Sequence, residues 1–246
     1  MTLPGLLTLA AFFAAVLSGM TGLGGGTLLI AVLYAAGLAP GVAVPLHAGV
    51  QLVSNASRTF AYLGHVDWRG CLLFMVTALP APFLALPLVA GFDADALRLF
   101  MAGFIVLAMW PGWLARLRLQ GPAGLLLSGA VAGGVGMVTG ATGLLIAPFF
   151  LREQWSKETV IATMAVCQSL AYLVKIAAFW LHGDSLLAHT PLLLPMALAV
   201  IVGTLVGRRL VNVFDEQGFR RVFRLILALL AIKLAWDGLR GMLMSA

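Results

Sequence analysis

The sequence predicts an all-α integral membrane protein: a polytopic helical bundle of two inverted repeats, with about five helical pieces in each. Of the 246 residues, 62% are hydrophobic and only 10% are charged, which leaves too little polar surface to cover a soluble protein of this size. Apolar stretches recur along the whole chain. Polar residues of the first half also return in the second half at matching spacing. The chain is therefore predicted to form one membrane domain.

Hydropathy and loop signals place ten helical pieces along the chain, separated by short polar clusters. The pieces cover residues 3–20, 27–38, 41–64, 70–90, 95–114, 122–137, 141–151, 157–181, 189–211 and 218–241. The second and seventh are short, since about a dozen residues rise only ~18 Å while the hydrocarbon core is ~30 Å thick. We expect about eight to ten membrane segments, depending on whether these short pieces cross the membrane fully.

Two of the longer pieces have features that affect this assignment. The first piece resembles the apolar core of a signal peptide, but no basic residue occurs before Arg58. Because a signal peptide begins with a positively charged region, we interpret the piece as a retained membrane segment. The fourth piece contains prolines at 80, 82 and 87, and we expect them to kink it.

Basic residues gather in the loops that follow odd-numbered pieces. Ten lie there or just inside the next piece: Arg69, Arg116, Arg118, Arg152, Lys157, Arg208, Arg209, Arg220, Arg221 and Arg224. Near the opposite face the only basic residues are Arg98 and Arg240. By the positive-inside rule, these loops are cytoplasmic and both termini are periplasmic or extracellular, in a multi-pass protein of the cell (inner) membrane. The net charge of +6 then reflects these loops, and we expect no nucleic-acid partner.

A second copy of the first half begins about 117 residues further on. The sequence LLIA at 28–31 returns at 144–147. Four polar residues, Gln51, Arg58, His65 and Asp67, correspond to Gln168, Lys175, His182 and Asp184. We therefore predict two repeats, residues 1–120 and 121–246. Because five pieces are an odd number, the copies must be inverted, as in secondary transporters whose substrate site lies between the repeats near the membrane midplane.

Polar side chains form a stripe on one face of two predicted helices. The third piece carries His47, Gln51, Asn55 and Arg58 on one face, and the eighth carries Gln168, Tyr172, Lys175 and His182. Ionisable residues at such depth normally face the bundle interior or a water-filled path. Two other interpretations stay open: snorkelling for Arg58 and Lys175, and helix–helix contacts for Gln51 and Asn55.

Glycines interrupt the helical pattern once in each half, in GLGGGT (22–27) and in TGATG (139–143). Consecutive glycines destabilise a helix by roughly 1 kcal/mol each relative to alanine, so we predict a break and a new helix starting at Thr27. The exposed N–H groups of such a start suit an anion. Close helix packing stays open as the alternative for the GxxxG pairs, which are Gly22/Gly26, Gly136/Gly140, Gly129/Gly133 and Gly203/Gly207.

The stripes and the breaks together define a predicted substrate site. Its residues are Gly24, Gly25, Gly26, Thr27, Gln51, Asn55, Arg58, Gly140, Thr142, Gly143, Gln168 and Lys175. Asp and Glu occupy loops or the ends of the predicted helices, so the charge balance inside the bundle favours an anion. We expect no catalytic residue, no cofactor and no metal. The His65/Asp67 and His182/Asp184 pairs are interpreted as helix caps, and Cys71 and Cys167 as buried thiols.

Four stretches resemble the sulfite exporter TauE/SafE family, also called the TSUP family. They are GLGGGTLLI, GHVDWR (64–69), TGATGLLIAPFF, and the run from GTLVGRRL to FRRVFRLIL, so the resemblance covers nearly the whole chain. It implies an inner-membrane permease that moves sulfite, sulfoacetate or related anions, generally outward and coupled to an ion gradient (H⁺ or Na⁺). Three departures occur: Ala31 and Val32 stand where the family tends to have a proline, His47-Ala48-Gly49 replaces a usual Gly-Thr-Ser, and the second glycine cluster is thinner than the family pattern.

We therefore predict a secondary transporter, not an enzyme, that exports a small sulfur-containing anion by alternating access. Sulfite or an organosulfonate such as sulfoacetate is the favoured substrate. A permease for another small anion or metabolite is the alternative. An intramembrane enzyme is disfavoured, because His47 is the only deep histidine and no buried acid accompanies it. The lipid bilayer is the expected surrounding, and the oligomeric state is left open, with a homodimer among the options.

Overall fold

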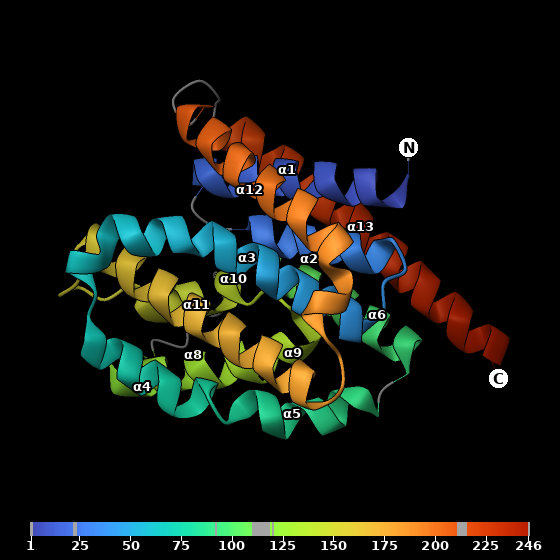
Figure 1. The fold of residues 1–246 in the computed structure, drawn as a ribbon, viewed down its shortest axis with the longest axis horizontal. Coiled ribbons are helices and arrows are strands. Elements are labelled where there is room, and N and C mark those ends of the chain that lie inside the picture. The colour runs from blue at the N-terminus through green and yellow to red at the C-terminus, as the bar shows by residue number, and fades with distance from the viewer. Residues whose placement is uncertain are drawn as a thin grey trace.

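The computed structural model of the protein describes residues 2–21, 24–91, 93–109, 119, 121–210 and 216–245. Within these residues every regular element is a helix and no strand occurs (Figure 1). The predicted all-α fold class is therefore confirmed. Gly22, Arg116 and Arg118, which entered the predictions of helix packing and of charge asymmetry, lie outside the described residues.

The helices follow the predicted order closely. In the first half they are α1 (Leu3–Thr21), α2 (Gly25–Ala35), α3 (Pro40–Tyr62), α4 (Trp68–Ala78), α5 (Ala81–Ala90) and α6 (Ala94–Met109). In the second half they are α8 (Pro122–Gly133), α9 (Gly136–Thr139), α10 (Gly143–Phe150), α11 (Lys157–Leu181), α12 (Thr190–Leu210) and α13 (Glu216–Ser245). Each half contains one short helix that follows a glycine break, α2 and α10, as predicted.

Within the described residues, four helical stretches are long and apolar enough to cross a membrane. They are Leu3–Met20, Trp68–Pro87, Lys157–Leu181 and Leu186–Gly207. Large hydrophobic side chains also cover the outside of the molecule, and Leu243, Leu187 and Phe60 are 81%, 78% and 78% exposed. An outer surface this apolar is suited to lipid rather than to water. The chain is a membrane protein.

Two predicted helices are divided in the structure. The fourth piece, expected as one kinked helix, is interrupted by a turn at Leu79–Pro80 between α4 and α5. Pro80 and Pro82 each lack the N–H that a helix interior needs, so two hydrogen bonds are lost within three residues. The sixth piece ends at Gly133, four residues earlier than expected, and the turn Gly134–Val135 leads into the short α9. Glycine weakens a helix at this point because it has the largest conformational freedom to lose.

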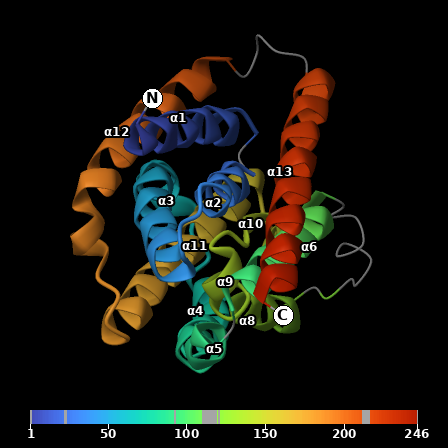
Figure 2. The ribbon, with the colours of Figure 1, turned by 90° about the vertical axis from the view of Figure 1, so that its right-hand side faces the viewer.

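The helices are arranged in pairs around a central pair, α3 and α11, which lie side by side (Figures 1 and 2). Helix α1 packs along α12, α4 along α8, and α6 along α13. A shift of about 117 residues converts α1 into α8 and α4 into α12, so the first two pairs are counterparts of one another. The same shift relates the partners within the α3–α11 and α6–α13 pairs. A two-fold relation between the halves would produce this pattern.

Two of the GxxxG pairs bring helices into close contact, as the packing alternative predicts. A Cβ atom added to Gly207 of α12 would lie 2.2 Å from the carbonyl oxygen of Val16 in α1. One added to Gly129 of α8 would lie 2.1 Å from the carbonyl oxygen of Phe74 in α4. Their partners Gly203 and Gly133 make similar approaches. Only glycine allows backbones to come this near, so these glycines have a packing role.

Candidate functional site

The first glycine break separates α1 from α2. Gly24 has a φ of 92°, a left-handed conformation that glycine adopts readily. Helix α2 therefore begins at Gly25, two residues before the predicted start at Thr27. The first helical hydrogen bond joins the N–H of Leu28 to the carbonyl of Gly24 at 3.1 Å, and no side chain caps this end. The N–H groups of residues 25–27 precede that bond and have no helical partner.

The second glycine break lies between α9 and α10. Gly140 has a φ of 64°, and α10 begins at Gly143. The N–H groups of Leu145 and Ile146 both bond to the carbonyl of Thr142, at 2.9 and 3.0 Å. The N–H groups at the very start of α10 are thus left without a helical partner. Both predicted breaks exist, and each is followed by a helix start.

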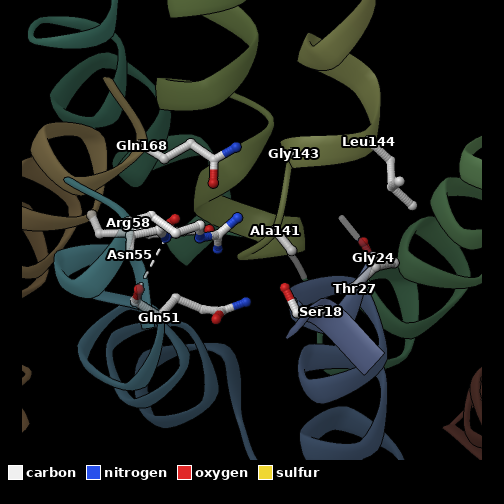
Figure 3. Close-up of a pocket in the computed structure, with 12 residues that line it drawn as sticks. Ser18, Gly24, Thr27, Gln51, Asn55, Arg58, Ala141, Gly143, Leu144 and Gln168 are labelled. Carbon is white, nitrogen blue, oxygen red and sulfur yellow. Dashed lines mark hydrogen bonds between the residues drawn. The ribbon is translucent and has the colours of Figure 1, made fainter. Parts of the chain in front are cut away.

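A small cavity, here called the central cavity, lies between the two breaks (Figure 3). Its volume is about 30 Å³, compared with the ~10–15 Å³ that one water molecule requires. It is lined by Ser18, Gly24, Gly26, Thr27, Gln51, Asn55, Arg58, Ala141, Gly143, Leu144, Gln168 and Tyr172. Figure 3 shows the amide and guanidinium side chains of α3 and α11 on one side of this space and the two breaks on the other. The central cavity thus brings together residues from both halves of the chain.

Most of the predicted site residues line the central cavity, and four do not. Those in the lining are Gly24, Gly26, Thr27, Gln51, Asn55, Arg58, Gly143 and Gln168. Gly25, Gly140, Thr142 and Lys175 lie outside it. The lining also contains four residues that were not among the predicted site residues: Ser18, Ala141, Leu144 and Tyr172. Tyr172 was already on the predicted polar stripe, so it was the one that the pattern could have identified.

Each break is in contact with a glutamine of its own half. A Cβ atom on Gly26 would lie 2.1 Å from Nε2 of Gln51, and one on Gly143 would lie 3.1 Å from Nε2 of Gln168. The two glutamines occupy corresponding positions in the two halves. Any side chain at Gly26 must therefore displace the Gln51 amide from its place beside the helix start.

Gly25 contributes to packing rather than to the cavity wall. A Cβ atom there would lie 2.1 Å from the carbonyl oxygen of Ala14 and 2.7 Å from Cβ of Ser18, both in α1. The absence of a side chain lets α2 approach α1 closely. Gly25 was predicted as a substrate-binding residue. It lies outside the lining of the central cavity, and the space that a side chain would need is filled by α1.

Asn55 is held in place by its own helix. Its side chain is 2% exposed, and Nδ2 donates a hydrogen bond to the carbonyl of Gln51 at 2.9 Å. Oδ1 has no partner among the described residues. Asn55 therefore presents an acceptor near the central cavity, while the donors come from Gln51, Arg58 and Gln168.

A larger cavity of about 750 Å³, here called the vestibule, adjoins the central cavity and shares Ser18, Asn55, Arg58 and Gln168 with it. The vestibule extends to the loop before α11 and to the start of that helix. Its ionisable lining residues include Arg58, Arg152, Lys157 and Glu153. Three cations against one carboxylate favour the approach of anions.

Lys175, the counterpart of Arg58 in the second half, is buried behind the central cavity. Its side chain is 1% exposed, and Nζ donates a hydrogen bond to the carbonyl of Gly140 at 2.9 Å. Gly136 leaves room for it, since a Cβ atom there would lie 2.4 Å from Nζ. Arg58 lines both cavities, whereas Lys175 lies beyond Tyr172 on the side away from the vestibule. The two corresponding cations thus have different surroundings.

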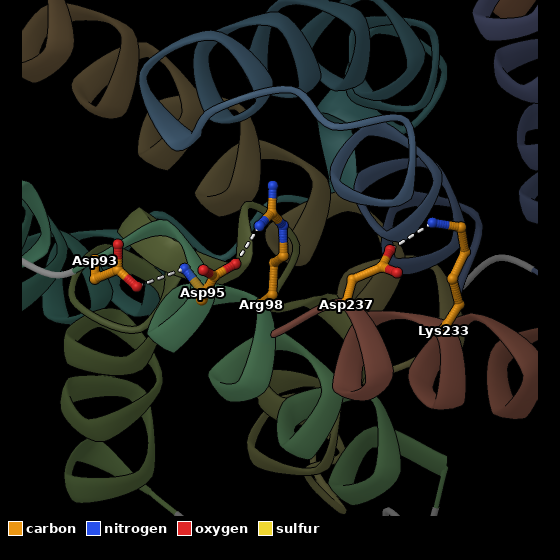
Figure 4. Close-up of polar contacts among 5 residues, drawn as sticks. All are labelled: Asp93, Asp95, Arg98, Lys233 and Asp237. Atoms are coloured by element: carbon orange, nitrogen blue, oxygen red, sulfur yellow. Dashed lines mark hydrogen bonds and ion pairs between the residues drawn. The ribbon is translucent and has the colours of Figure 1, made fainter. Parts of the chain in front are cut away.

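The carboxylates of the described residues lie away from the central cavity. Asp67 caps α4 by accepting a hydrogen bond from the N–H of Gly70 at 2.9 Å, which confirms its predicted role. Asp95 pairs with Arg98, and Asp237 pairs with Lys233 at 2.5 Å (Figure 4). No Asp or Glu whose side-chain exposure the structure describes is buried. A cation in the central cavity would therefore have no carboxylate partner there.

The cysteines and the other metal-binding residue types form no recognisable ligand set. Cys71 and Cys167 are buried, as predicted, and their Sγ atoms are 3.6 Å apart. Within the ranges that the structure describes, no group of three or more His, Cys, Asp or Glu side chains could hold a metal ion. The polar groups that line the central cavity are side-chain amides, hydroxyls, backbone groups and the guanidinium of Arg58.

Comparison with known proteins gives one match. A family model described as Sulfite exporter TauE/SafE matches residues 7–234, which is nearly the whole chain. Searches of the curated proteins and of the solved structures found no match.

Proposed function

The chain belongs to the sulfite exporter TauE/SafE family, and we propose on this basis that it is a secondary transporter for sulfite or an organosulfonate such as sulfoacetate. Membership of this family indicates a membrane permease rather than an enzyme. The choice of anion, its outward direction and an alternating-access mechanism are our proposal. The central cavity, the vestibule and Lys175 provide the support for these three points.

The observation that carries the proposal is that both glycine breaks end at one cavity. The first turn of a helix has N–H groups without helical partners and a partial positive charge. Gly26 and Thr27 of α2, together with Gly143 and Leu144 of α10, bring two such starts to the central cavity. Groups of this kind bind a dehydrated anion. Two helix starts of this kind surround a cavity that has room for only a few atoms, which suits the head group of a sulfite or sulfonate.

The charges around the central cavity also favour an anion. Arg58 contributes a guanidinium, and Gln51 and Gln168 contribute amide donors. No carboxylate whose exposure the structure describes is buried. Planar guanidinium groups bind oxyanions well because they donate two parallel hydrogen bonds. This lining of cationic and amide donors matches an anion better than a cation or a neutral metabolite.

The unequal surroundings of Arg58 and Lys175 support alternating access. Arg58 lines the vestibule, whereas Lys175 is hydrogen-bonded behind the central cavity. An inverted repeat can exchange such roles when one half rocks against the other. We propose that Lys175 becomes accessible, and Arg58 buried, when the far side of the molecule opens.

We propose that the vestibule faces the cytoplasm of a cell whose inner membrane contains the protein. Arg152 and Lys157 line the vestibule and belong to a loop that the positive-inside rule assigns to the cytoplasm. Anions collected there would be released on the opposite side, which corresponds to export.

The direct test is counterflow of ³⁵S-sulfite in proteoliposomes. We expect saturable exchange that unlabelled sulfite or sulfoacetate inhibits and that acetate does not. Arg58→Gln should lower the exchange rate roughly tenfold or more, since one charged hydrogen bond to the anion is worth ~1.5–3 kcal/mol. Arg240→Gln is the matched control, because Arg240 is exposed near the end of α13, and it should retain the wild-type rate.

Three outcomes would contradict parts of this proposal. If neither sulfite nor sulfoacetate moves, the substrate assignment is wrong. Flux that is insensitive to competing anions would indicate a cation or neutral-metabolite permease. Full activity in both Arg58→Gln and Lys175→Gln would show that these charges do not act on the substrate.

A further inference from the structure

His47 of α3 is a buried polar side chain outside the lining of the central cavity. Its exposure is 0%, and Nε2 lies 3.0 Å from the carbonyl oxygen of Gly26. Because that oxygen can only accept, Nε2 carries the hydrogen. Nδ1 is buried and has no hydrogen-bond partner in the part of the chain that the structure describes. The imidazole therefore keeps a free lone pair that is able to take up a proton.

The ring of His47 lies between the two glycine breaks. Its Nε2 is bonded to Gly26 at the first break. At the second break, a Cβ atom on Gly140 would lie 3.1 Å from Nδ1. A movement of one half of the molecule against the other must therefore change the surroundings of Nδ1.

Lys175 and Tyr172 of α11 are the titratable side chains that face His47 within the described residues. The ring of Tyr172 meets the imidazole edge-on, with centroids 5.8 Å apart, and Nζ of Lys175 lies 5.0 Å from the same tyrosine ring. Gly26 of α2 and Gly140 of the α9–α10 break present backbone to the ring. On another side of α3, Leu186 and Leu193 contact Gly49, two residues from His47. Nζ of Lys175 and Nδ1 of His47 both lie against Gly140. Two buried positive charges there would repel, so we expect His47 to be neutral while Lys175 is bonded to Gly140.

We propose that His47 is a proton-binding site that couples anion export to a proton gradient. This inference rests on the proposed function, because it assigns the coupling ion to the same transport cycle. Its structural basis is that Nδ1 of His47 has no hydrogen-bond partner among the described residues and lies beside Gly140. The carbonyl oxygen of Gly140 accepts the hydrogen bond from Lys175.

The cycle moves one proton against each anion. With the vestibule open, Lys175 is bonded to Gly140, His47 is neutral and the anion enters the central cavity. When the far side opens, Lys175 leaves Gly140, the anion departs, and the lone pair of Nδ1 takes a proton from water on that side. On return, Lys175 bonds to Gly140 again, and His47 gives the proton to water on the vestibule side. The proton is the only species bound and released by His47, and no other covalent bond changes.

This cycle predicts that a pH gradient alone drives the anion towards the acidic compartment. Proteoliposomes with an acidic lumen, with the membrane potential held at zero by K⁺ and valinomycin, should accumulate ³⁵S-sulfite. For one proton per anion and a gradient of about one pH unit, the expected accumulation is up to about tenfold. The neutral, protonated form of sulfite can also leak through the bilayer, but this leakage accumulates sulfite on the alkaline side. Protein-free liposomes serve as the control that measures it.

His47→Gln separates coupling from binding. A glutamine amide can still donate to the carbonyl of Gly26 but cannot take up a proton near neutral pH. Counterflow at equal pH should stay within about threefold of wild type, while accumulation driven by the pH gradient should be lost. His65→Gln, at an exposed position, is the matched control and should retain both activities.

Accumulation by His47→Gln at the wild-type level would overturn the proposal. So would wild-type protein that shows counterflow but no accumulation, or accumulation on the alkaline side. These wild-type results decide the question even if His47→Gln fails to fold, and in each case the proposed transport function stands. Absence of wild-type counterflow with both anions would instead contradict the proposed function itself.

Discussion

Each of the three consecutive glycines at the first break meets a different requirement. Gly24 takes a left-handed conformation, Gly25 lets α2 approach the backbone of α1, and Gly26 leaves space for the amide of Gln51. Only the third requirement concerns the central cavity directly. Substitution at the three positions should therefore have different consequences for stability and for transport.

Gly26→Ala is expected to separate transport from stability. A Cβ atom 2.1 Å from Nε2 of Gln51 must displace that amide, and losing its hydrogen bond to the anion should reduce sulfite exchange roughly tenfold. Alanine also favours the helix by up to ~1 kcal/mol relative to glycine, so the unfolding temperature should not fall. Sulfite counterflow and thermal unfolding of the purified variant measure the two effects.

Gly143→Ala provides the comparison within the same molecule. The added Cβ would lie 3.1 Å from Nε2 of Gln168, a contact that a small shift of the amide relieves. We expect the exchange rate to fall by no more than about threefold. An equal or larger loss in Gly143→Ala than in Gly26→Ala would show that the glutamine contacts do not set the rate.

At the level of helices, close packing relies on glycine in both halves. Gly207 and Gly203 of α12 contact α1, and Gly129 and Gly133 of α8 contact α4. These contacts join corresponding helix pairs, α1–α12 and α8–α4. These two tightly packed pairs therefore stabilise the arrangement of helices around the central α3–α11 pair.

Gly207→Leu should destabilise the fold by at least ~1–3 kcal/mol, because a larger side chain would force α12 away from the backbone of α1 at Val16. The free energy of unfolding can be measured by titration with SDS in mixed micelles. Val202→Leu on the exposed face of α12, where Val202 is 53% exposed, should change it by less than ~0.5 kcal/mol. Equal stability of the two variants would contradict a packing role for Gly207.

The order of the helices and both breaks could be predicted from the sequence, because hydrophobic runs and consecutive glycines leave direct local signals. The divisions at Leu79–Pro80 and at Gly134–Val135 could not be located in this way, since prolines and glycines also occur within continuous membrane helices. The side-chain stripes identified Gln51, Arg58 and Gln168 for the central cavity. The burial of Lys175 and the packing of Gly25 against α1 depend on contacts between distant segments, which the sequence pattern does not contain.

At the scale of the whole molecule, the vestibule opens at one end of the described helices. The vestibule leads to the central cavity from the start of α11, and Lys175 lies on the closed side. Ile161 lines the vestibule, whereas Ala178, one turn beyond Lys175 in α11, is 1% exposed. These two positions are therefore suited to measuring which side is open.

Ile161→Cys should react with a charged, membrane-impermeant thiol reagent much faster than Ala178→Cys. In cells, we expect the reaction from the cytoplasmic side only, so it should occur in inverted vesicles and not in right-side-out ones. The native Cys71 and Cys167 are 3% and 0% exposed and give a low background. Faster labelling of Ala178→Cys, or labelling of Ile161→Cys from the periplasm, would contradict the proposed orientation.

The pairing of an arginine in one half with a lysine in the other also has a kinetic consequence. Two halves with identical cations would present the same site to both compartments, and the substrate concentration that half-saturates transport would be equal on the two sides. Arg58 offers a rigid, planar guanidinium, whereas Lys175 offers a compact and mobile ammonium. The transporter should therefore be half-saturated at a lower anion concentration from the Arg58 side than from the Lys175 side, so the two directions of transport would saturate at different substrate levels although the net flux without a gradient is zero.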